Sequence, residues 1–258
     1  MKLLDLYCGA GGAAMGYHRA GLDVVGVDIK EQPNYPFELI QSDVFDLDES
    51  FINKFDIIHA SPPCQAYLPV TKLYNNKDKN GNPYPDLLAA TRELIKYNCY
   101  VIENVTAAKL IDPIVLCGTM FNLEVIRHRK FEINSEVWVF PPCKCNHNGT
   151  IRDGAYASVI NGNTPRLHAG GYPGREAEER VNYKRGVIKR VSKYLINNGE
   201  AQYKGAWNNA VYLDWCDAMD IHWMNKHPTL TNNKYDLTQA IPPAYTEWIG
   251  KLLISGAA

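Results

Sequence analysis

The chain lacks several features that would place it in special classes of protein. None of its apolar runs approaches the ~20 residues needed to cross a bilayer. Its start, Met1-Lys2, leads directly into a short apolar segment and not into the longer hydrophobic stretch of a secretory signal. Internal repeats and low-complexity tracts are also missing. We therefore expect a soluble, cytoplasmic protein with no membrane partner.

Cysteines arranged for disulfide bonds are missing too. The seven cysteines are an odd number, scattered through a chain long enough to form a core without cross-links. We expect reduced thiols. The cluster Cys143, Cys145 and His147 suggests a zinc site, but structural zinc sites favour about two to four residues between paired cysteines. Because no matching second pair follows, we expect no metal.

What the chain does have is an ordinary globular composition with an uneven charge. Hydrophobic residues make up 46% and charged residues 21%, and the net charge is −1. Between Lys144 and Lys204, however, eleven Lys and Arg face five Asp and Glu, which is a net charge of +6. This segment is a candidate nucleic-acid footprint, although a solvated surface with a chance excess of charge is the alternative.

The N-terminal segment combines a strand, a glycine-rich turn and a helix. Leu3 to Tyr7 predicts the strand, Cys8-Gly9-Ala10-Gly11-Gly12 the turn, and Ala13 to Ala20 the helix. Such a turn lets backbone N–H groups approach a nucleotide-like ligand closely. A second strand, Val24 to Asp28, ends in an acid at the distance where a carboxylate would hold the ribose of a bound adenosine.

A third apolar run, Phe37 to Ile40, is followed by Asp43. Its carboxylate could accept a hydrogen bond from an adenine amino group, or it could cap the helical turn that follows, and the sequence leaves both open. Helical segments such as Leu87 to Tyr97 alternate with these strands. The alternation predicts an α/β protein with a doubly wound, mostly parallel sheet.

Candidate catalytic residues follow the next strands. Phe55 to Ala60 predicts a buried strand, and the prolines of Ser61-Pro62-Pro63-Cys64 end it and hold the thiol at its C-terminal end, where ligands bind in such sheets. Tyr100 to Val105 predicts another strand, which carries Glu103. Arg127 and Arg129 stand two apart in an apolar segment, so at strand spacing both side chains would lie on one face.

The rest of the chain predicts a small irregular second domain and a return to the first. Glycines and prolines interrupt residues 134 to 204, where only Glu176 to Tyr194 has a helical pattern. Trp207 to Met224 predicts a helix, and Pro242-Pro243 marks the start of a last helix with a core-facing stripe. We expect a first domain of residues 1–133 plus about 225–258, and a small second domain of about 134–224; the family resemblance described next implies that the first is catalytic and binds the cofactor and that the second recognises the target.

Several motifs, in order, resemble those of the cytosine-C5 methyltransferase family. The cofactor loop of the family is similar to Asp5 to Gly12, its Pro-Cys motif to Ser61 to Gln65, and its Glu-Asn-Val motif to Glu103 to Val105. The Arg-x-Arg motif matches Arg127 to Arg129, and the C-terminal motif resembles the helix after Ile241-Pro242-Pro243. Thr238-Gln239 stands where the family has Gly-Asn, and the target-recognition region is short for the family.

The resemblance implies a Rossmann-like, S-adenosylmethionine-dependent methyltransferase fold and DNA cytosine-C5 methylation, as in restriction-modification systems. Cys64 would add to C6 of cytosine, because carbon 5 is a poor nucleophile until aromaticity is broken. Glu103 would donate to the N3 edge, which requires a raised pKa. Arg129 would bond the base's O2, and Arg127 would hold the carboxylate or the thiolate. The cytosine would be flipped out of the duplex, with the Leu68 to Asp86 loop closing over it.

The cofactor would be S-adenosylmethionine, with S-adenosylhomocysteine as product, lying over the glycine-rich turn. The residues implied to bind it are Tyr7, Cys8, Gly9, Ala10, Gly11, Gly12, Asp28, Ile29, Asp43, Val44, Pro63, Gln239 and Ala240. The expected partner is double-stranded DNA, bound by a monomer. Two alternatives stay open: a family enzyme that acts on tRNA, and a catalytically silent nucleic-acid-binding relative. A nicotinamide oxidoreductase is disfavoured because it leaves the Pro-Pro-Cys and Glu-Asn-Val motifs unexplained.

Overall fold

A computed structural model of the chain describes residues 1–68, 71, 75–78, 80–137, 139–149, 155–157, 159, 204–226 and 236–256. Within these ranges no helix is both long and apolar enough to cross a membrane. The described residues fall into two compact units. The first comprises Met1–Leu116, Arg127–Cys143 and Pro243–Ala258, and the second comprises Cys117–Ile126 and Lys144–Pro242. The predicted domain boundaries, 1–133 plus 225–258 and 134–224, remain a prediction.

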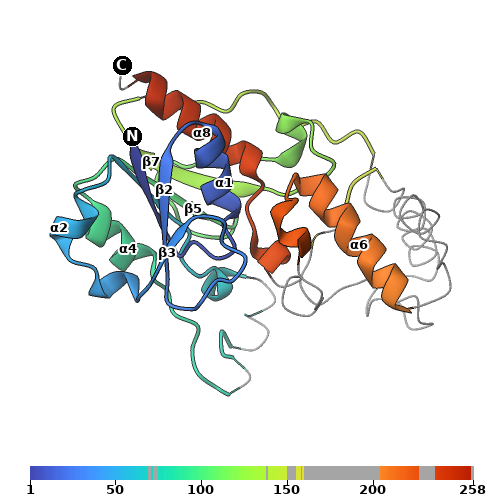
Figure 1. Cartoon of the computed structure of the whole chain (residues 1–258), viewed down its shortest axis with the longest axis horizontal. Helices are drawn as coiled ribbons and strands as arrows, with labels where there is room; N and C mark the ends of the chain where they lie inside the picture. The colour runs from blue at the N-terminus through green and yellow to red at the C-terminus, as the bar shows by residue number, and fades with distance from the viewer. Residues whose placement is uncertain are drawn as a thin grey trace. The chain divides into compact units, whose positions relative to one another are not determined.

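The first unit is built on a seven-stranded sheet with the order β3-β2-β1-β4-β5-β7-β6 (Figure 1). Its strands are β1 Lys2–Leu6, β2 Asp23–Asp28, β3 Glu38–Gln41, β4 Ile57–Ala60, β5 Tyr100–Asn104, β6 Ile114–Leu116 and β7 Arg129–Asn134. The first five strands pair in parallel, while β7 is antiparallel to both β5 and β6. Because the order reverses between β1 and β4, the C-terminal strand ends there form the edge where ligands bind in such sheets.

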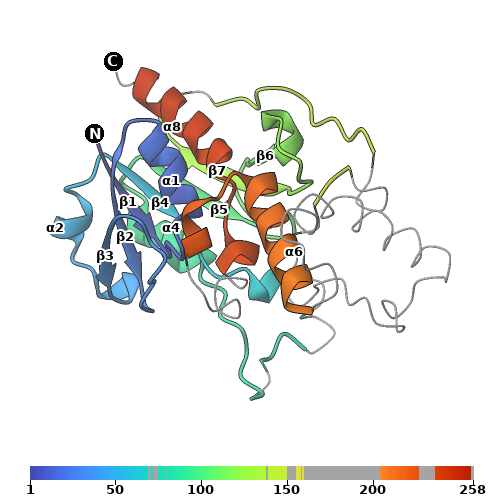
Figure 2. The same cartoon turned by 45° about the vertical axis from the view of Figure 1, so that its right-hand side comes forward.

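Helices cover both faces of this sheet. They are α1 Gly12–Arg19, α2 Glu49–Ile52, α4 Leu88–Ile95 and α8 Pro243–Gly256, with 3₁₀ turns η1 Val44–Asp46 and η2 Gln65–Tyr67. Alternate strand residues, such as Leu4, Ile58 and Ile102, form an apolar core with Ile52 of α2 and Ile95 of α4. Helices α1 and α8 lie side by side on the other face (Figure 2). The predicted α/β class with a mostly parallel, Rossmann-like sheet is confirmed.

The second unit contains α6 Lys204–Met219 and the 3₁₀ turns η3 Gly118–Phe121 and η4 Trp223–Lys226. Where the sequence predicted one helix over 207–224, α6 ends at Met219, and the separate 3₁₀ turn η4 begins at Trp223. Val125 forms an isolated bridge with Ala157. The predicted helix over 176–194, and most of the basic segment 144–204, lie outside the described residues.

Candidate active site

The thiol of Cys64 stands on a turn that the neighbouring strand holds in place. After β4 ends at Ala60, the side-chain amide of Asn104 donates a hydrogen bond to the Pro62 carbonyl (2.9 Å), and the Asn104 amide oxygen accepts from the Val105 N–H (2.9 Å). Prolines have no N–H with which to form the backbone hydrogen bonds of a sheet. The Asn104 side chain, at the end of β5, instead forms the hydrogen bond that connects this turn to the neighbouring strand. Cys64 is half-buried and begins the 3₁₀ turn η2.

Glu103 and Arg129 form an ion pair beside this turn. Glu103 lies on β5 and is 6% exposed, and its Oε1 lies 3.0 Å from Arg129 Nε at the start of β7. The approach is close but not aligned as a hydrogen bond, so Oε1 has no hydrogen-bond donor among the described residues. A buried carboxyl oxygen without a donor is the group that an incoming polar ligand edge would satisfy.

Arg127 reaches the same site by a different route from the predicted one. The sequence suggested that Arg127 and Arg129 share one face of a strand, but β7 begins at Arg129. The backbone carbonyl of Arg127 instead accepts a hydrogen bond from the hydroxyl of Tyr245 in α8, at 2.6 Å. The Arg127 side chain is buried and acts electrostatically on both Glu103 and Cys64. The last helix therefore fixes the main chain that carries this guanidinium.

Burial and charge set the proton affinities of these groups. Burial raises the pKa of Glu103 above its ordinary value, while Arg129, Arg127 and a hydrogen bond from Ser61 pull it back. Burial also raises the pKa of the Cys64 thiol, with a further rise from Glu103 and opposing effects from the two arginines. Burial, and then Arg129, lowers the pKa of Arg127 to about 9. Glu103 is thus suited to donate a proton at a pH where an exposed glutamate could not.

A chain of hydrogen bonds extends from Glu103 into the protein. His59 on β4 lies 3.1 Å from the Tyr17 hydroxyl through Nδ1 and 2.9 Å from the Ser61 hydroxyl through Nε2. Ser61 in turn hydrogen bonds to Glu103. Burial lowers the pKa of His59 to about 3, so the ring is neutral and can donate from one nitrogen while accepting at the other. The neutral side chains of Tyr17, His59 and Ser61 therefore form a hydrogen-bonded chain that orients Glu103.

The glycine-rich turn has the backbone geometry of a ligand cradle. Tyr7 (φ 58°), Gly9 (φ 50°) and Gly11 (φ 84°) adopt left-handed conformations, which glycine alone adopts without cost. The Gly9 N–H donates to the Asp28 carboxylate at 3.1 Å, and the Lys30 N–H donates to its other oxygen at 2.9 Å. A side-chain atom added at Gly9 would meet nothing within 4 Å, so the space over this turn is open.

The ends of β2 and β3 complete the cradle. Ile29 follows Asp28 and its side chain is 61% exposed, which suits a flat apolar base. Asp43 accepts a hydrogen bond from the Phe45 N–H (3.1 Å), so the capping role that the sequence left open is present. A carboxylate can accept more than one hydrogen bond, and the adenine contact stays a prediction. Val44 is buried beneath this turn. These features fit an adenosyl group.

The cradle and the thiol turn are adjacent. The Ser61 N–H donates to the Leu6 carbonyl at 3.2 Å, which joins the end of β4 to the end of β1. Pro63 and Cys64 therefore follow directly beside Tyr7 and the glycine-rich turn. Two predicted cofactor residues, Gln239 and Ala240, belong to the other compact unit, and their contact with the cofactor remains a prediction.

The loop expected to close over the site is anchored at its base. The Thr71 hydroxyl donates to the Gln65 carbonyl at 2.6 Å, next to the thiol turn, and the Tyr67 hydroxyl donates to the Asp86 carboxylate. A short bridge joins Lys77 and Pro83. Residues 69–70, 72–74 and 79 lie outside the described part of the chain. The anchored base fixes where the loop leaves the sheet.

Sequence reasoning missed several residues that shape the site. Asn104 and Ser61 stood inside motifs already noticed, yet their partners are distant in the sequence. His59 and Tyr17 gave no signal, because a lone histidine or tyrosine in an apolar segment is common in cores. Asp5 stood in the cofactor-loop motif but was given no role of its own. It is 1% exposed, its oxygens have no hydrogen-bond partner among the described residues, and burial raises its pKa well above the ordinary value.

A mostly parallel sheet that brings a glycine-rich turn, a half-buried thiol and a buried carboxyl to one edge defines a Rossmann-like protein of the methyltransferase fold class. Residues 1–111 match the family model of the C-5 cytosine-specific DNA methylase. This match confirms, over these residues, the resemblance predicted from the motifs.

Curated relatives match about two fifths of the chain. It is 28% identical over 112 residues to Type II methyltransferase M.FnuDI of Fusobacterium nucleatum, across 41% of this chain and 32% of that protein. It is 29% identical over 121 residues to Type II methyltransferase M.AquIA of Picosynechococcus sp., across 40% of this chain and 48% of that protein. The chain thus spans less than half the length of these relatives.

Solved structures match over nearly the whole chain at low identity. One, described as a DNA modification methyltransferase encoded within an E. coli prophage, has a TM-score of 0.60 at 15% identity and covers 99% of both chains. The S. pombe Dnmt2 methyltransferase has a TM-score of 0.54 at 13% identity, covering 100% of this chain and 99% of that one. At these identities the likeness concerns the fold.

Proposed function

We propose that this protein, acting as a monomer, transfers a methyl group from S-adenosylmethionine to C5 of a flipped cytosine in double-stranded DNA through a covalent Cys64 adduct. One observation carries the proposal: a half-buried thiol on a proline turn lies beside a buried carboxyl of raised pKa, at the edge that also holds the glycine-rich turn. The family match over residues 1–111 and the Type II methyltransferases among the relatives support the same reaction.

The first step needs a thiolate and a proton donor together. Cys64 Sγ forms a bond to C6 of cytosine, and the electron pair of the C5–C6 double bond moves towards N3 and O2. Glu103, whose pKa burial raises, gives its proton to N3 as negative charge develops there. Arg129 stabilises the charge at O2, and Arg127 lowers the pKa of the thiol. Carbon 5 then has the electron density to take a methyl group.

The second step, which follows methyl transfer to C5, removes the enzyme from the base. The proton on C5 is lost to water, the Sγ–C6 bond breaks, and Cys64 leaves as a thiolate while N3 returns its proton to Glu103. S-adenosylmethionine supplies the electrophilic methyl group when it is bound. The backbone of residues 8–12, Asp28 on the ribose and Ile29 on the base would hold it. Tyr7 directly precedes the glycine-rich turn, and Pro63 directly precedes Cys64.

Trapping the adduct tests the proposal. Duplex DNA in which every cytosine is 5-fluorocytosine needs no knowledge of the recognition sequence, and fluorine at C5 cannot leave as a proton. We expect a denaturant-resistant complex that depends on the cofactor, with the DNA attached to the Cys64 peptide by mass spectrometry. Cys64→Ser should form none, because a hydroxyl is far less ionised than a thiol. Cys99→Ser is the matched control and should form the complex normally.

Two further arms separate chemistry from substrate. Glu103→Gln should still bind DNA but form the adduct about 100-fold more slowly or worse, the usual effect of losing a general acid. An adduct with Cys64→Ser would refute the mechanism. If RNA containing 5-fluorocytidine is trapped and the duplex is not, the substrate is RNA and the DNA assignment is wrong.

A further inference from the structure

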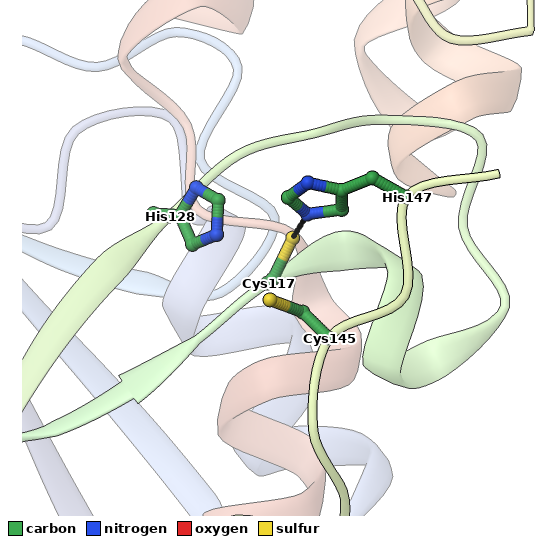
Figure 3. Close-up of side chains that lie close together, drawn as sticks. All are labelled: Cys117, His128, Cys145 and His147. Carbon is green, nitrogen blue, oxygen red and sulfur yellow. Dashed lines mark hydrogen bonds between the residues drawn. The ribbon is translucent and has the colours of Figure 1, made fainter. Parts of the chain in front are cut away.

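Two cysteines and a histidine from separate segments of the second unit come together (Figure 3). Cys117 begins the 3₁₀ turn η3, while Cys145 and His147 lie in a segment without regular secondary structure further along the chain. Cys117 Sγ lies 3.5 Å from His147 Nε2, and the ligand atoms of all three residues lie within 4.8 Å of one another. Cys117 is fully buried, and the other two residues are exposed.

The surrounding contacts hold both segments of this cluster. The Ala157 N–H donates to the Glu124 carbonyl at 2.8 Å, which ties the Cys117 segment to residues 155–157. The ring of Tyr156 packs edge-on against His147, with 6.5 Å between ring centroids, and its hydroxyl donates to the Asn146 carbonyl. The same short stretch therefore supports the cysteine on one side and the histidine on the other.

The donor set and the spacing fit a tetrahedral metal ion. Two thiolates with an imidazole are soft and borderline ligands, which select zinc over the hard cations. With Zn–S near 2.3 Å and Zn–N near 2.0–2.1 Å, tetrahedral angles place sulfur and nitrogen about 3.6 Å apart. The Cys117 to His147 distance of 3.5 Å agrees with this value. A thiol–imidazole hydrogen bond has a similar length, so the convergence of Cys145 on the same pair is what favours a metal.

We propose that Cys117, Cys145 and His147 supply three of the ligands of one bound zinc ion. On binding, the two thiols lose their protons and His147 coordinates as neutral imidazole, so the ion cross-links segments about 30 residues apart. Figure 3 also draws His128, which belongs to the other unit; the proposal rests on the three residues that share one unit.

This proposal departs from the expectation of no metal. That expectation came from the spacing around Cys143 and Cys145 and from the absence of a second pair downstream. The partner of Cys145 and His147 is instead Cys117, which stands upstream of them, next to β6. Cys143, which suggested a paired site in the sequence, is not part of the cluster. A spacing rule for paired cysteines does not detect a ligand contributed by a distant segment.

Metal analysis of the purified full chain tests the site. The affinity tag is removed, the protein is dialysed against metal-free buffer, and zinc is counted by mass spectrometry. We expect about one zinc per chain, released when a mercurial reagent modifies the thiols. Cys145→Ser and His147→Ala change exposed residues and should lose the zinc while staying folded. Cys143→Ser, in the same segment, is the matched control and should keep it.

Cobalt substitution gives a readout that does not depend on any variant. The cobalt-loaded wild type should show a thiolate-to-cobalt charge-transfer band and the intense visible bands of a tetrahedral ion. Any one of three results would overturn the proposal: wild type that holds no zinc or cobalt after reconstitution, Cys143→Ser that loses zinc as fully as Cys145→Ser, or a Cys117–Cys145 disulfide found in protein purified without oxidant.

Discussion

At the scale of single residues, the proposed chemistry depends on two neighbouring acids whose proton affinities are set by opposing effects. Burial is the largest influence on both Glu103 and Cys64, and it raises both pKa values. A raised pKa helps Glu103, which has to donate a proton, and hinders Cys64, which has to lose one. Arg129 and Arg127 act in the opposite direction on both groups. The two arginines therefore favour the Cys64 thiolate, but they also lower the pKa of Glu103 and so oppose the protonated form that has to donate.

This balance predicts opposite shifts in the reactivity of Cys64. A thiol ionises at higher pH than a carboxyl, so Glu103 is charged when Cys64 titrates, and its charge raises the thiol pKa. Glu103→Gln removes the charge and should move the alkylation profile of Cys64 to lower pH. Arg129→Gln removes a stabilising cation and should move it to higher pH. Iodoacetamide labelling across pH, with peptide mapping of Cys64, measures both.

Cys99 serves as an internal control in the wild type and in both variants. Cys99 is half-buried and its raised pKa comes from burial alone, so its alkylation profile should be the same in wild type and in both variants. Shifts of Cys64 in the same direction in the two variants would show that repacking, and not charge, sets its pKa.

Asp5 is a buried carboxyl group without a hydrogen-bond partner among the described residues, which is unfavourable for folding. Its carboxyl is buried beside the neighbouring strand residues Gly26 and His59, and burial followed by Asp28 raises its pKa. The ring of Tyr35 covers Gly26 so closely that an added Cβ would lie 2.4 Å from its Cζ atom. No side chain larger than glycine can therefore stand on β2 at this point. The glycine permits the aromatic ring to pack against the sheet close to Asp5, which acts electrostatically on Tyr35.

At the scale of elements, the packing of α8 on α1 connects the C-terminus to the catalytic edge. Thr246 donates its hydroxyl to the Ala13 carbonyl at 2.8 Å, and Tyr245 on the same helix holds Arg127. The two helices approach so closely that a Cβ added at Gly16 would lie 2.1 Å from the Pro243 carbonyl oxygen and 2.7 Å from the Glu247 nitrogen. These are backbone atoms, which cannot move aside as a flexible side chain can.

Gly16→Ala should therefore destabilise the protein although alanine is the better helix former. Propensity alone would favour the change by up to about 1 kcal/mol, but overpacking against backbone typically costs about 1–3 kcal/mol, so the steric effect dominates. Chemical denaturation followed by tryptophan fluorescence measures the change. Ser255→Ala, on the exposed last turn of α8, is the control and should stay within about 0.5 kcal/mol of wild type. A neutral or stabilising Gly16→Ala would show that the helices separate easily.

The strands that the sequence predicted best are those in which an apolar run ends in a polar residue. Strands β2 and β5 end in Asp28 and Asn104, and β4 is followed directly by Ser61. This pattern arises because a parallel sheet buries both of its faces and leaves its C-terminal edge to ligands. Strand β6 has only three residues and was not predicted, since a run that short has no periodicity to detect. Strand β7 was predicted to include Arg127, but its pairing with β5 begins at Lys130 and with β6 at Arg129.

The sequence motifs predicted the candidate reactive residues of the site, but not the residues that hold them in position. Cys64 and Glu103 could be found because each follows or ends a recognisable strand. The groups that orient them come from far away in the sequence: Asn104 holds the Pro62 carbonyl across 42 residues, and Tyr245 holds Arg127 across 118. No local pattern encodes such contacts. Cys117 escaped notice for the same reason.

At the scale of the whole molecule, charge is divided between segments in a way that matters for DNA. Residues 144 to 204 carry a net charge of +6 in a chain whose total is −1, so the rest of the chain is acidic. Most of this basic segment lies outside the described residues, so the expectation here comes from sequence alone. An acidic body repels the phosphate backbone, and a basic segment then determines which part of the protein approaches the duplex.

DNA affinity should accordingly depend on this segment and on salt. Each phosphate that Lys or Arg neutralises releases counterions, so log K should fall linearly with log salt, by roughly 0.9 per phosphate. Replacing Arg185, Lys189 and Arg190 by Gln should weaken duplex binding at low salt and reduce the slope by about 1 for each phosphate that is no longer neutralised. Fluorescence anisotropy with a labelled duplex, from low to high salt, measures both quantities.

The matched control removes the same charge elsewhere. Lys54, Lys96 and Lys251 are exposed lysines on the sheet-bearing unit, and two of them pair with neighbouring glutamates on their own helix or turn. Replacing all three by Gln lowers the net charge equally, so any effect of total charge alone is the same in both triple variants. We expect the control to keep nearly the wild-type slope, because the slope changes only where the replaced side chain would meet a phosphate. Equal reductions in the two variants would mean that duplex binding follows net charge, and that residues 144 to 204 are not the footprint.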